Sequence, residues 1–204
     1  MSLFAKIITP IDYLMISHNE KKWFDFVLPI IASGIVVLVI NFLPKNISLI
    51  GKDSLISLVN GILQILSGFY IASMAAVATF QKKGMDDVMD GVAPRLRGKK
   101  LTRRRFLTYL FGYLAFISIT LYFIGGAVQL ISSSIKDLHL AQYNWLRNIC
   151  LFIYMSFVCN ILSTTALGMF FMIDKMHEEK SELIIPKENE VSHNEDNEDN
   201  EDQP

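Results

Sequence analysis

The sequence predicts an all-α, polytopic membrane protein with four transmembrane helices and with both ends of the chain on the cytoplasmic side. Of its 204 residues, 51% are hydrophobic and only 19% are charged. The charged residues also leave four long stretches free, over 26–44, 54–81, 106–135 and 148–173. Each stretch is long enough to cross ~30 Å of hydrocarbon as a helix, which needs roughly 20 residues. These observations exclude a soluble enzyme with one buried core as the first interpretation.

The spans are expected at about 26–44, 55–80, 106–131 and 149–173, inside a transmembrane domain of residues 23–176. Pro29 should kink or start the first helix near the membrane surface, because proline lacks a backbone N–H. The leader, 1–22, has apolar residues at three- and four-residue spacing, which is typical of a helix lying in the interface. An ordered cytoplasmic leader packed against the other helices explains the same pattern equally well.

Basic residues set the expected orientation. The leader, the loop 81–105 and the segment after 173 hold 15 of the 19 Lys and Arg. Because positive residues resist translocation, all three should be cytoplasmic. The final segment, 177–204, has eight Asp or Glu and no Lys or Arg from Glu188 onward, and its low apolar content predicts a disordered acidic tail.

Small residues follow one face of the second span and one face of the fourth. In lipid, close backbone contact through small residues does much of the helix packing. The two stripes therefore predict packing within one bundle or an oligomer interface, and the sequence leaves both open. Their members are Gly61, Gly68, Ala72 and Ala76 on the second span, and Ser156, Asn160, Thr164 and Gly168 on the fourth.

Gln64 and Asn160 are the main polar groups expected inside the membrane, at matching depths. An amide in hydrocarbon needs hydrogen-bond partners, so we expect the two to pair with each other, with nearby serines or with a second copy. The four charge-free stretches argue against an ion-coupled transporter, in which ionisable groups lie inside the membrane. A passive pore stays open.

The loop 81–105 carries nine Lys or Arg against three Asp. Its basic cluster next to the third span predicts contact with anionic lipid or with a soluble partner. Direct nucleic-acid binding is not expected, because no aromatic residues interleave the cluster. The cluster comprises Arg95, Arg97, Lys99, Lys100, Arg103, Arg104 and Arg105.

Neither a catalytic centre nor a metal or cofactor site is expected. The chain has no nucleophile–base pair, no phosphate-binding loop and no paired carboxylates in a plausible pocket. Its four histidines are scattered over the flanking segments, and Cys150 and Cys159 lie ~13 Å apart along one predicted helix, too far for a disulfide.

In overall layout the chain resembles the membrane subunit of Kiwa, a two-component bacterial anti-phage system. The resemblance lies in its length of about 200 residues, in four spans with both ends inside, and in the basic turn from Pro94 to Phe106 followed by Phe111-Gly112-Tyr113. It implies a non-catalytic protein of the bacterial inner membrane that forms a homo-oligomer, a tetramer. It further implies that the chain senses phage attachment or injection and holds a soluble DNA-binding subunit at the cytoplasmic face.

Two other classes of function remain open from the residues. One is a small oligomeric pore or exporter, which would show conductance or efflux by itself. The other is a plain membrane anchor or assembly factor, which needs only its cytoplasmic contacts. Charge is rich in the cytoplasmic segments and absent from the expected spans, which favours a partner-binding protein over a transporter.

Overall fold

The chain is a multi-pass helical membrane protein. A computed structural model describes residues 9–16, 19–44, 47–51, 53–79, 81, 85–88, 94–132 and 144–175. Four helical segments in it are long and apolar enough to cross a membrane: Trp23–Phe42, Leu55–Thr79, Arg103–Leu130 and Asn144–Ile173. The prediction of an all-α fold with four such helices is confirmed. The acidic tail predicted over 177–204 lies outside the described residues.

Three of the four helices begin earlier in the chain than the spans expected from the charge-free stretches. The first starts at Trp23 and therefore includes Asp25, the third starts at Arg103, and the fourth starts at Asn144. A boundary drawn at the last charged residue fails here, because Asp25 and Arg103 are buried in the protein and do not face solvent or lipid. The second span, Leu55–Thr79, agrees closely with the expected one.

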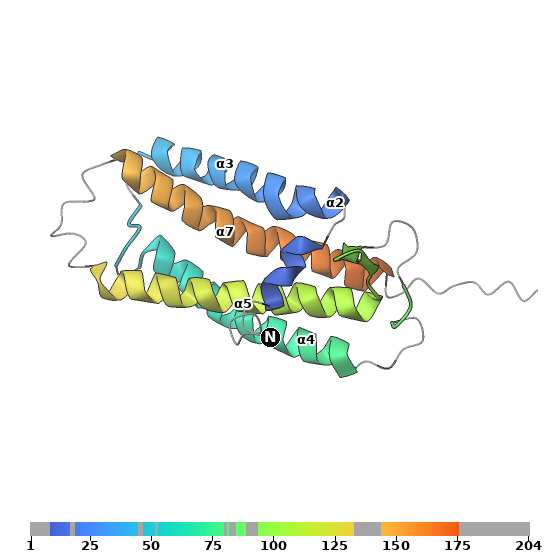
Figure 1. The fold of residues 1–204 in the computed structure, drawn as a ribbon. Coiled ribbons are helices and arrows are strands. Elements are labelled where there is room, and N and C mark those ends of the chain that lie inside the picture. The colour runs from blue at the N-terminus through green and yellow to red at the C-terminus, as the bar shows by residue number, and fades with distance from the viewer. Residues whose placement is uncertain are drawn as a thin grey trace, which may run out of the picture.

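The helices form two antiparallel pairs, which lie one above the other in Figure 1. Helix α3 (Leu28–Phe42) packs along α7 (Asn144–Phe170), and α4 (Leu55–Thr79) packs along α5 (Arg103–Leu130). The short helix α2 (Asn19–Lys22) and a π-helix, η2 (Trp23–Val27), precede α3, and a second π-helix, η4 (Phe171–Lys175), follows α7. Contacts between α5 and α7 join the two pairs.

A 3-10 helix, η1 (Thr9–Met15), crosses α5 in front of the gap between the pairs (Figure 1). Its Tyr13 is completely buried, whereas Met15 is 65% exposed. The segment 9–16 therefore lies against the bundle, which corresponds to the packed alternative for the leader. Residues 1–8 are outside the described part of the chain.

A two-stranded hairpin lies at one end of the bundle. Strands β1 (Arg95–Leu96) and β2 (Lys99–Lys100) pair antiparallel, and Arg97 and Gly98 form the turn with φ of 51° and 82°. Two central residues with positive φ are what a tight hairpin turn requires, and glycine at the second position favours it. This pair of strands, residues 95–100, is called the hairpin below.

The hairpin shares its end of the bundle with the start of α5 and the ends of α4 and α7. Arg97 in the turn lies 3.2 Å from Asp12 of η1. The Phe106 and Phe171 rings are 4.9 Å apart, which places the start of α5 beside the end of α7. This end is called the basic end. The described parts of all three segments expected in the cytoplasm therefore meet at one end, and which side of the membrane it faces stays a prediction.

The outward surface between the two ends is apolar. The described helices present large hydrophobic side chains on their outer faces, as a bundle surrounded by lipid does. Examples are Ile35, Leu38, Ile65, Phe123 and Leu162, each more than half exposed.

Candidate functional site

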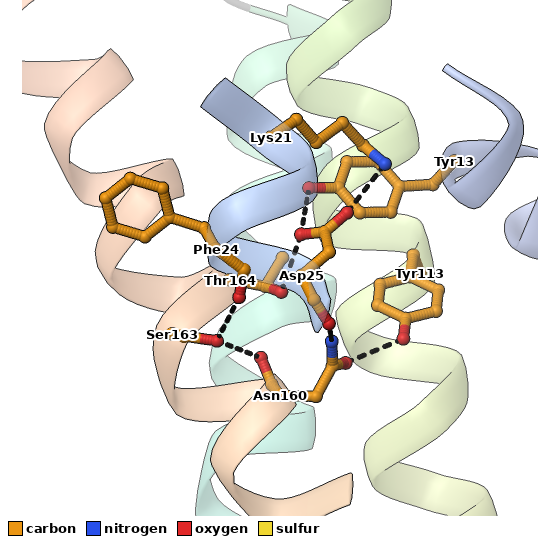
Figure 2. Close-up of polar contacts among 8 residues, drawn as sticks. All are labelled: Tyr13, Lys21, Phe24, Asp25, Tyr113, Asn160, Ser163 and Thr164. Atoms are coloured by element: carbon orange, nitrogen blue, oxygen red, sulfur yellow. Dashed lines mark hydrogen bonds and ion pairs between the residues drawn. The ribbon is translucent and has the colours of Figure 1, made fainter. Parts of the chain in front are cut away.

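Seven side chains from five elements meet at the basic end in a continuous set of polar contacts, shown in Figure 2. We call them the polar cluster: Tyr13, Lys21, Asp25, Tyr113, Asn160, Ser163 and Thr164. They come from η1, α2, η2, α5 and α7, and all seven are less than 10% exposed, as the residues of the apolar core are.

The polar cluster is built around two backbone carbonyls that η2 leaves free. Within this π-helix the Leu28 N–H donates to the Trp23 carbonyl, five residues back, so it does not bond to Phe24 in the α-helical way. Pro29 has no N–H to donate to Asp25, four residues earlier. The carbonyls of Phe24 and Asp25 therefore need other donors, and side chains of α7 supply them.

Asn160 is the central residue of these contacts. Its Nδ2 donates to the Asp25 carbonyl at 2.7 Å, and its Oδ1 accepts from the Tyr113 hydroxyl at 2.7 Å. One turn further along α7, the Ser163 hydroxyl donates to the Phe24 carbonyl at 2.7 Å. Asn160 thus joins the first span to α5, and the two bonds satisfy both ends of its amide (Figure 2).

A buried ion pair completes the polar cluster. Lys21 Nζ lies 2.6 Å from Asp25 Oδ2, and the side chains are 4% and 0% exposed. Asp25 Oδ1 accepts from the hydroxyls of Tyr13 and Thr164, each at 3.2 Å. The ammonium also lies 4.1 Å from the centre of the Tyr13 ring, within the range of a cation–π interaction. The two buried charges are therefore paired and further solvated by protein groups, as buried charges must be.

Burial affects the protonation of the groups around Asp25 that lie outside the spans. Desolvation, with a further contribution from the Asp25 charge, raises the pKa of Tyr13 far above its usual value. The hydroxyl consequently stays protonated and remains a hydrogen-bond donor to Asp25. Desolvation lowers the pKa of Lys21, and the charge of Asp25 acts in the opposite direction.

The hairpin presents a second group of candidate site residues. Arg95, Lys99 and Lys100 are exposed on its two strands. Among the described residues no carboxylate pairs with these three, while Arg97 is held by Asp12. The base of the hairpin is fixed by backbone bonds, from Leu101 N–H to the Pro94 carbonyl at 3.0 Å among others. Three cationic side chains therefore project from a well-anchored scaffold.

The basic residues that begin α5 have a different environment. Arg104 forms a bidentate contact with Asp86, at 2.8 Å and 3.1 Å, and donates to the Val77 and Ala78 carbonyls at the end of α4. These hydrogen bonds hold the pKa of Asp86 below its usual value. Arg103 is buried, whereas Arg105 is exposed. Of the three consecutive arginines, Arg105 alone is thus displayed at the surface.

The two small-residue stripes differ in where they lie. The stripe on α7 is inside the bundle: Ser156 shares a 2.9 Å hydrogen bond with Ser33, and a Cβ on Gly168 would lie 2.8 Å from Leu110 Cδ2. The stripe on α4 points outward. Gly61, Gly68, Ala72 and Ala76 are all exposed, and a Cβ on either glycine would meet nothing within 4 Å. Packing within one bundle is therefore wrong for the α4 stripe.

Of the partners expected for Gln64 and Asn160, pairing with each other is wrong. Gln64 is exposed on the outer face of α4, while Asn160 is buried against η2 and α5. The pairing was inferred from the matching depths of the two residues, and depth alone does not fix the direction in which a helical side chain points.

Sequence reasoning missed Tyr13, Lys21 and Asp25. A signal for two of them was present, because Lys21 and Asp25 are four residues apart and such residues are neighbours on a helix. The argument from charge-free spans is affected accordingly, because the first helix that could cross a membrane, Trp23–Phe42, includes Asp25. Tyr13 left no local signal, since its contacts are with residues distant in the chain.

The described residues contain no group of three or more His, Cys, Asp or Glu that could hold a metal ion. All four histidines lie outside them. The basic end combines the buried polar cluster with the exposed cationic hairpin. No family model, no curated protein and no solved structure matches the chain.

Proposed function

We propose that the chain is a non-catalytic membrane subunit that holds a soluble partner at its basic end. The observation that carries the proposal is the hairpin, whose Arg95, Lys99 and Lys100 are exposed and lack partners among the described residues. A partner with an acidic surface would be attracted to these charges, which would speed its encounter and fix its orientation.

Contact with anionic lipid is the main alternative for the basic residues, and the geometry supports it less well. A lipid site would use the arginines next to the third span, but Arg104 is held by Asp86 and Arg103 is buried. Arg105 and the hairpin remain, and the hairpin's free charges lie on two strands between α4 and α5, outside the helices that could cross the membrane. This favours a protein ligand.

The resemblance to the membrane subunit of Kiwa gives the proposal its biological form. In that form the chain is a subunit of the bacterial inner membrane, in a homo-oligomer, that responds to phage attachment or injection. The partner is then a soluble DNA-binding subunit, which is held at the membrane until it acts on incoming phage DNA. The chain itself contributes anchoring and recognition and performs no chemistry.

The test is affinity purification of the full chain from its native membranes in mild detergent, followed by identification of the co-purifying protein. The variant Arg95→Gln/Lys99→Gln/Lys100→Gln should lose most of that protein, and phage plating should show lost protection. The matched control is Lys22→Gln/Arg105→Gln, which removes exposed charges at the same end outside the hairpin. If the hairpin variant retains its partner as well as the control does, partner docking at the hairpin is disproved.

A second candidate function, an ion-coupled exporter, is favoured by one observation: Asp25 belongs to the first of the helices that could cross a membrane. Intramembrane carboxylates commonly mark ion pathways. This one is already occupied by Lys21 and two hydroxyls, which favours a structural role. An ion-driven flux across liposomes that contain only the purified chain would support the exporter over the partner-holding subunit.

A further inference from the structure

The short helix η1 contacts three parts of the protein: the hairpin turn, α5 and the start of the first span. Two consecutive residues do this. Asp12 holds Arg97 of the hairpin turn with both carboxylate oxygens at 3.2 Å. Tyr13 stacks on Tyr113 of α5, with ring centres 5.0 Å apart, and donates to Asp25 of the first span. Neighbouring residues of a 3-10 helix point about 120° apart, so one turn can reach both sides.

The position of Tyr13 matters because it bridges the two helix pairs. Its ring rests on α5, in the lower pair of Figure 1, while its hydroxyl and its ring face contact Asp25 and Lys21 at the start of the upper pair. We call the boundary between the two helix pairs the seam. Within the polar cluster, the other hydrogen bond across the seam is that from Tyr113 to Asn160. A shift of the first span against α5 must therefore move or release Tyr13.

We propose that η1 couples the hairpin to the packing of the two helix pairs. A rearrangement of the pairs that displaces Tyr13 also displaces Asp12, and Arg97 loses the contact that positions the hairpin turn. The coupling is reciprocal: a ligand that takes Arg97 away from Asp12 weakens the seating of Tyr13 between the pairs. That this coupling regulates partner binding rests on the proposed function, whereas the coupling itself does not.

The experiment measures the distance between the hairpin and α4 while substitutions alter the contacts between the two helix pairs. Spin labels are placed at Lys99→Cys on β2 and at Ala78→Cys, an exposed site at the end of α4, with Cys150 and Cys159 replaced by serine. The full chain is studied in zwitterionic nanodiscs and diluted with unlabelled chain. Pulsed electron–electron double resonance then gives the distribution of distances between the two labels, and it requires no partner protein.

Tyr13→Phe removes the hydroxyl that bonds to Asp25 and keeps the stacked ring. It should broaden the distribution and add longer distances, as Asp12→Asn should by releasing Arg97 directly. Asp25→Asn should also broaden the distribution. If Asp25→Asn does not fold, Tyr13→Phe alone tests the proposal. The matched control is Ser33→Ala, which is equally buried in α3 and bonds to Ser156 without touching η1.

The proposal is overturned if Tyr13→Phe, or folded Asp25→Asn, leaves the distribution as Ser33→Ala does. It is also overturned if Ser33→Ala broadens the distribution equally, because the effect would then be general loosening of the bundle. Since these distances are measured on the chain alone, their outcome is separate from partner capture. Failure to capture a partner would remove the proposed function and leave the coupling standing.

Discussion

Replacing Asn160 by leucine isolates the contribution of the polar cluster to the stability of the bundle. The substitution keeps a side chain of similar length but removes the donor to the Asp25 carbonyl and the acceptor for the Tyr113 hydroxyl. Both remaining groups are buried, and η2 offers the carbonyl no substitute, since Pro29 lacks an N–H. The loss should therefore appear as a lower free energy of unfolding.

Its size follows from the number of bonds. Interhelical hydrogen bonds in membrane proteins contribute about 0.6 kcal/mol on average and up to about 1.7 kcal/mol. With two bonds lost, Asn160→Leu should cost roughly 1–3 kcal/mol. Tyr113→Phe loses one of the same bonds and should cost about 0.6–1.7 kcal/mol. In the double variant that shared bond is lost only once, so the two costs should not add.

The assay is equilibrium unfolding of the detergent-solubilised chain with increasing SDS, followed by circular dichroism and by tryptophan fluorescence. Trp145→Phe leaves Trp23, the first residue of η2, as a local fluorescent reporter. A double-mutant cycle of Asn160→Leu and Tyr113→Phe then gives the coupling energy. The control cycle pairs Asn160→Leu with Tyr122→Phe, at the far part of α5, where independent sites should add within about 0.5 kcal/mol.

A coupling below about 0.3 kcal/mol in the first cycle, or one no larger than in the control cycle, would refute the reasoning. Such a result would mean that the hydrogen bond from Tyr113 to Asn160 does not hold the two helix pairs together. The two pairs would then be held by their other contacts, which include apolar packing and the hydrogen bonds of Tyr13 with Asp25 and of Tyr70 with Thr165.

Three further predictions concern orientation, packing and charge. In a chain without its native cysteines, an impermeant thiol reagent added to intact cells should label Ser48→Cys and spare Lys99→Cys; the reverse pattern would invert the topology. Gly168→Leu should lower the thermal stability of the bundle, typically by about 1–3 kcal/mol, because it overpacks a filled site. Gly68→Leu, at an open site, should spare that stability, and a changed particle mass would identify the α4 stripe as an interface between copies. Arg104 lowers the pKa of Asp86, so this carboxylate contributes stability above its unfolded-state pKa of about 4, and the contribution is lost as the pH falls further. Arg104→Gln should therefore make the melting temperature fall less steeply below about pH 4.

The number and positions of the helices were readable from the sequence because the physics is local. A helix that crosses hydrocarbon must be long and nearly free of charge, so counting charged residues located all four. The same count misplaced the start of the first helix, since Asp25 is tolerated inside it. That tolerance depends on Lys21, Tyr13 and Thr164, and two of these three reach Asp25 from other segments.

The candidate site was predictable only in part for the same reason. The basic residues of the hairpin were identified by composition, and Gly98 could have signalled the tight turn. Which arginines are free could not be read, because it depends on the pairing of Arg104 with Asp86, 18 residues away. Likewise the stripes of α4 and α7 look alike in sequence, and only tertiary packing turns one inward and the other outward.

The π-helix at the start of the first span also sets the rotational phase of everything after it. A π turn contains about one residue more than an α turn, and one residue corresponds to about 100° of rotation around the helix axis. Asp25 and Ser33 both contact α7, through Thr164 and Ser156. Deleting a single residue between Trp23 and Val27 would rotate one of the two relative to the other, so that both could no longer face α7. Length changes in homologous chains should accordingly be found on either side of this segment and be excluded from within it.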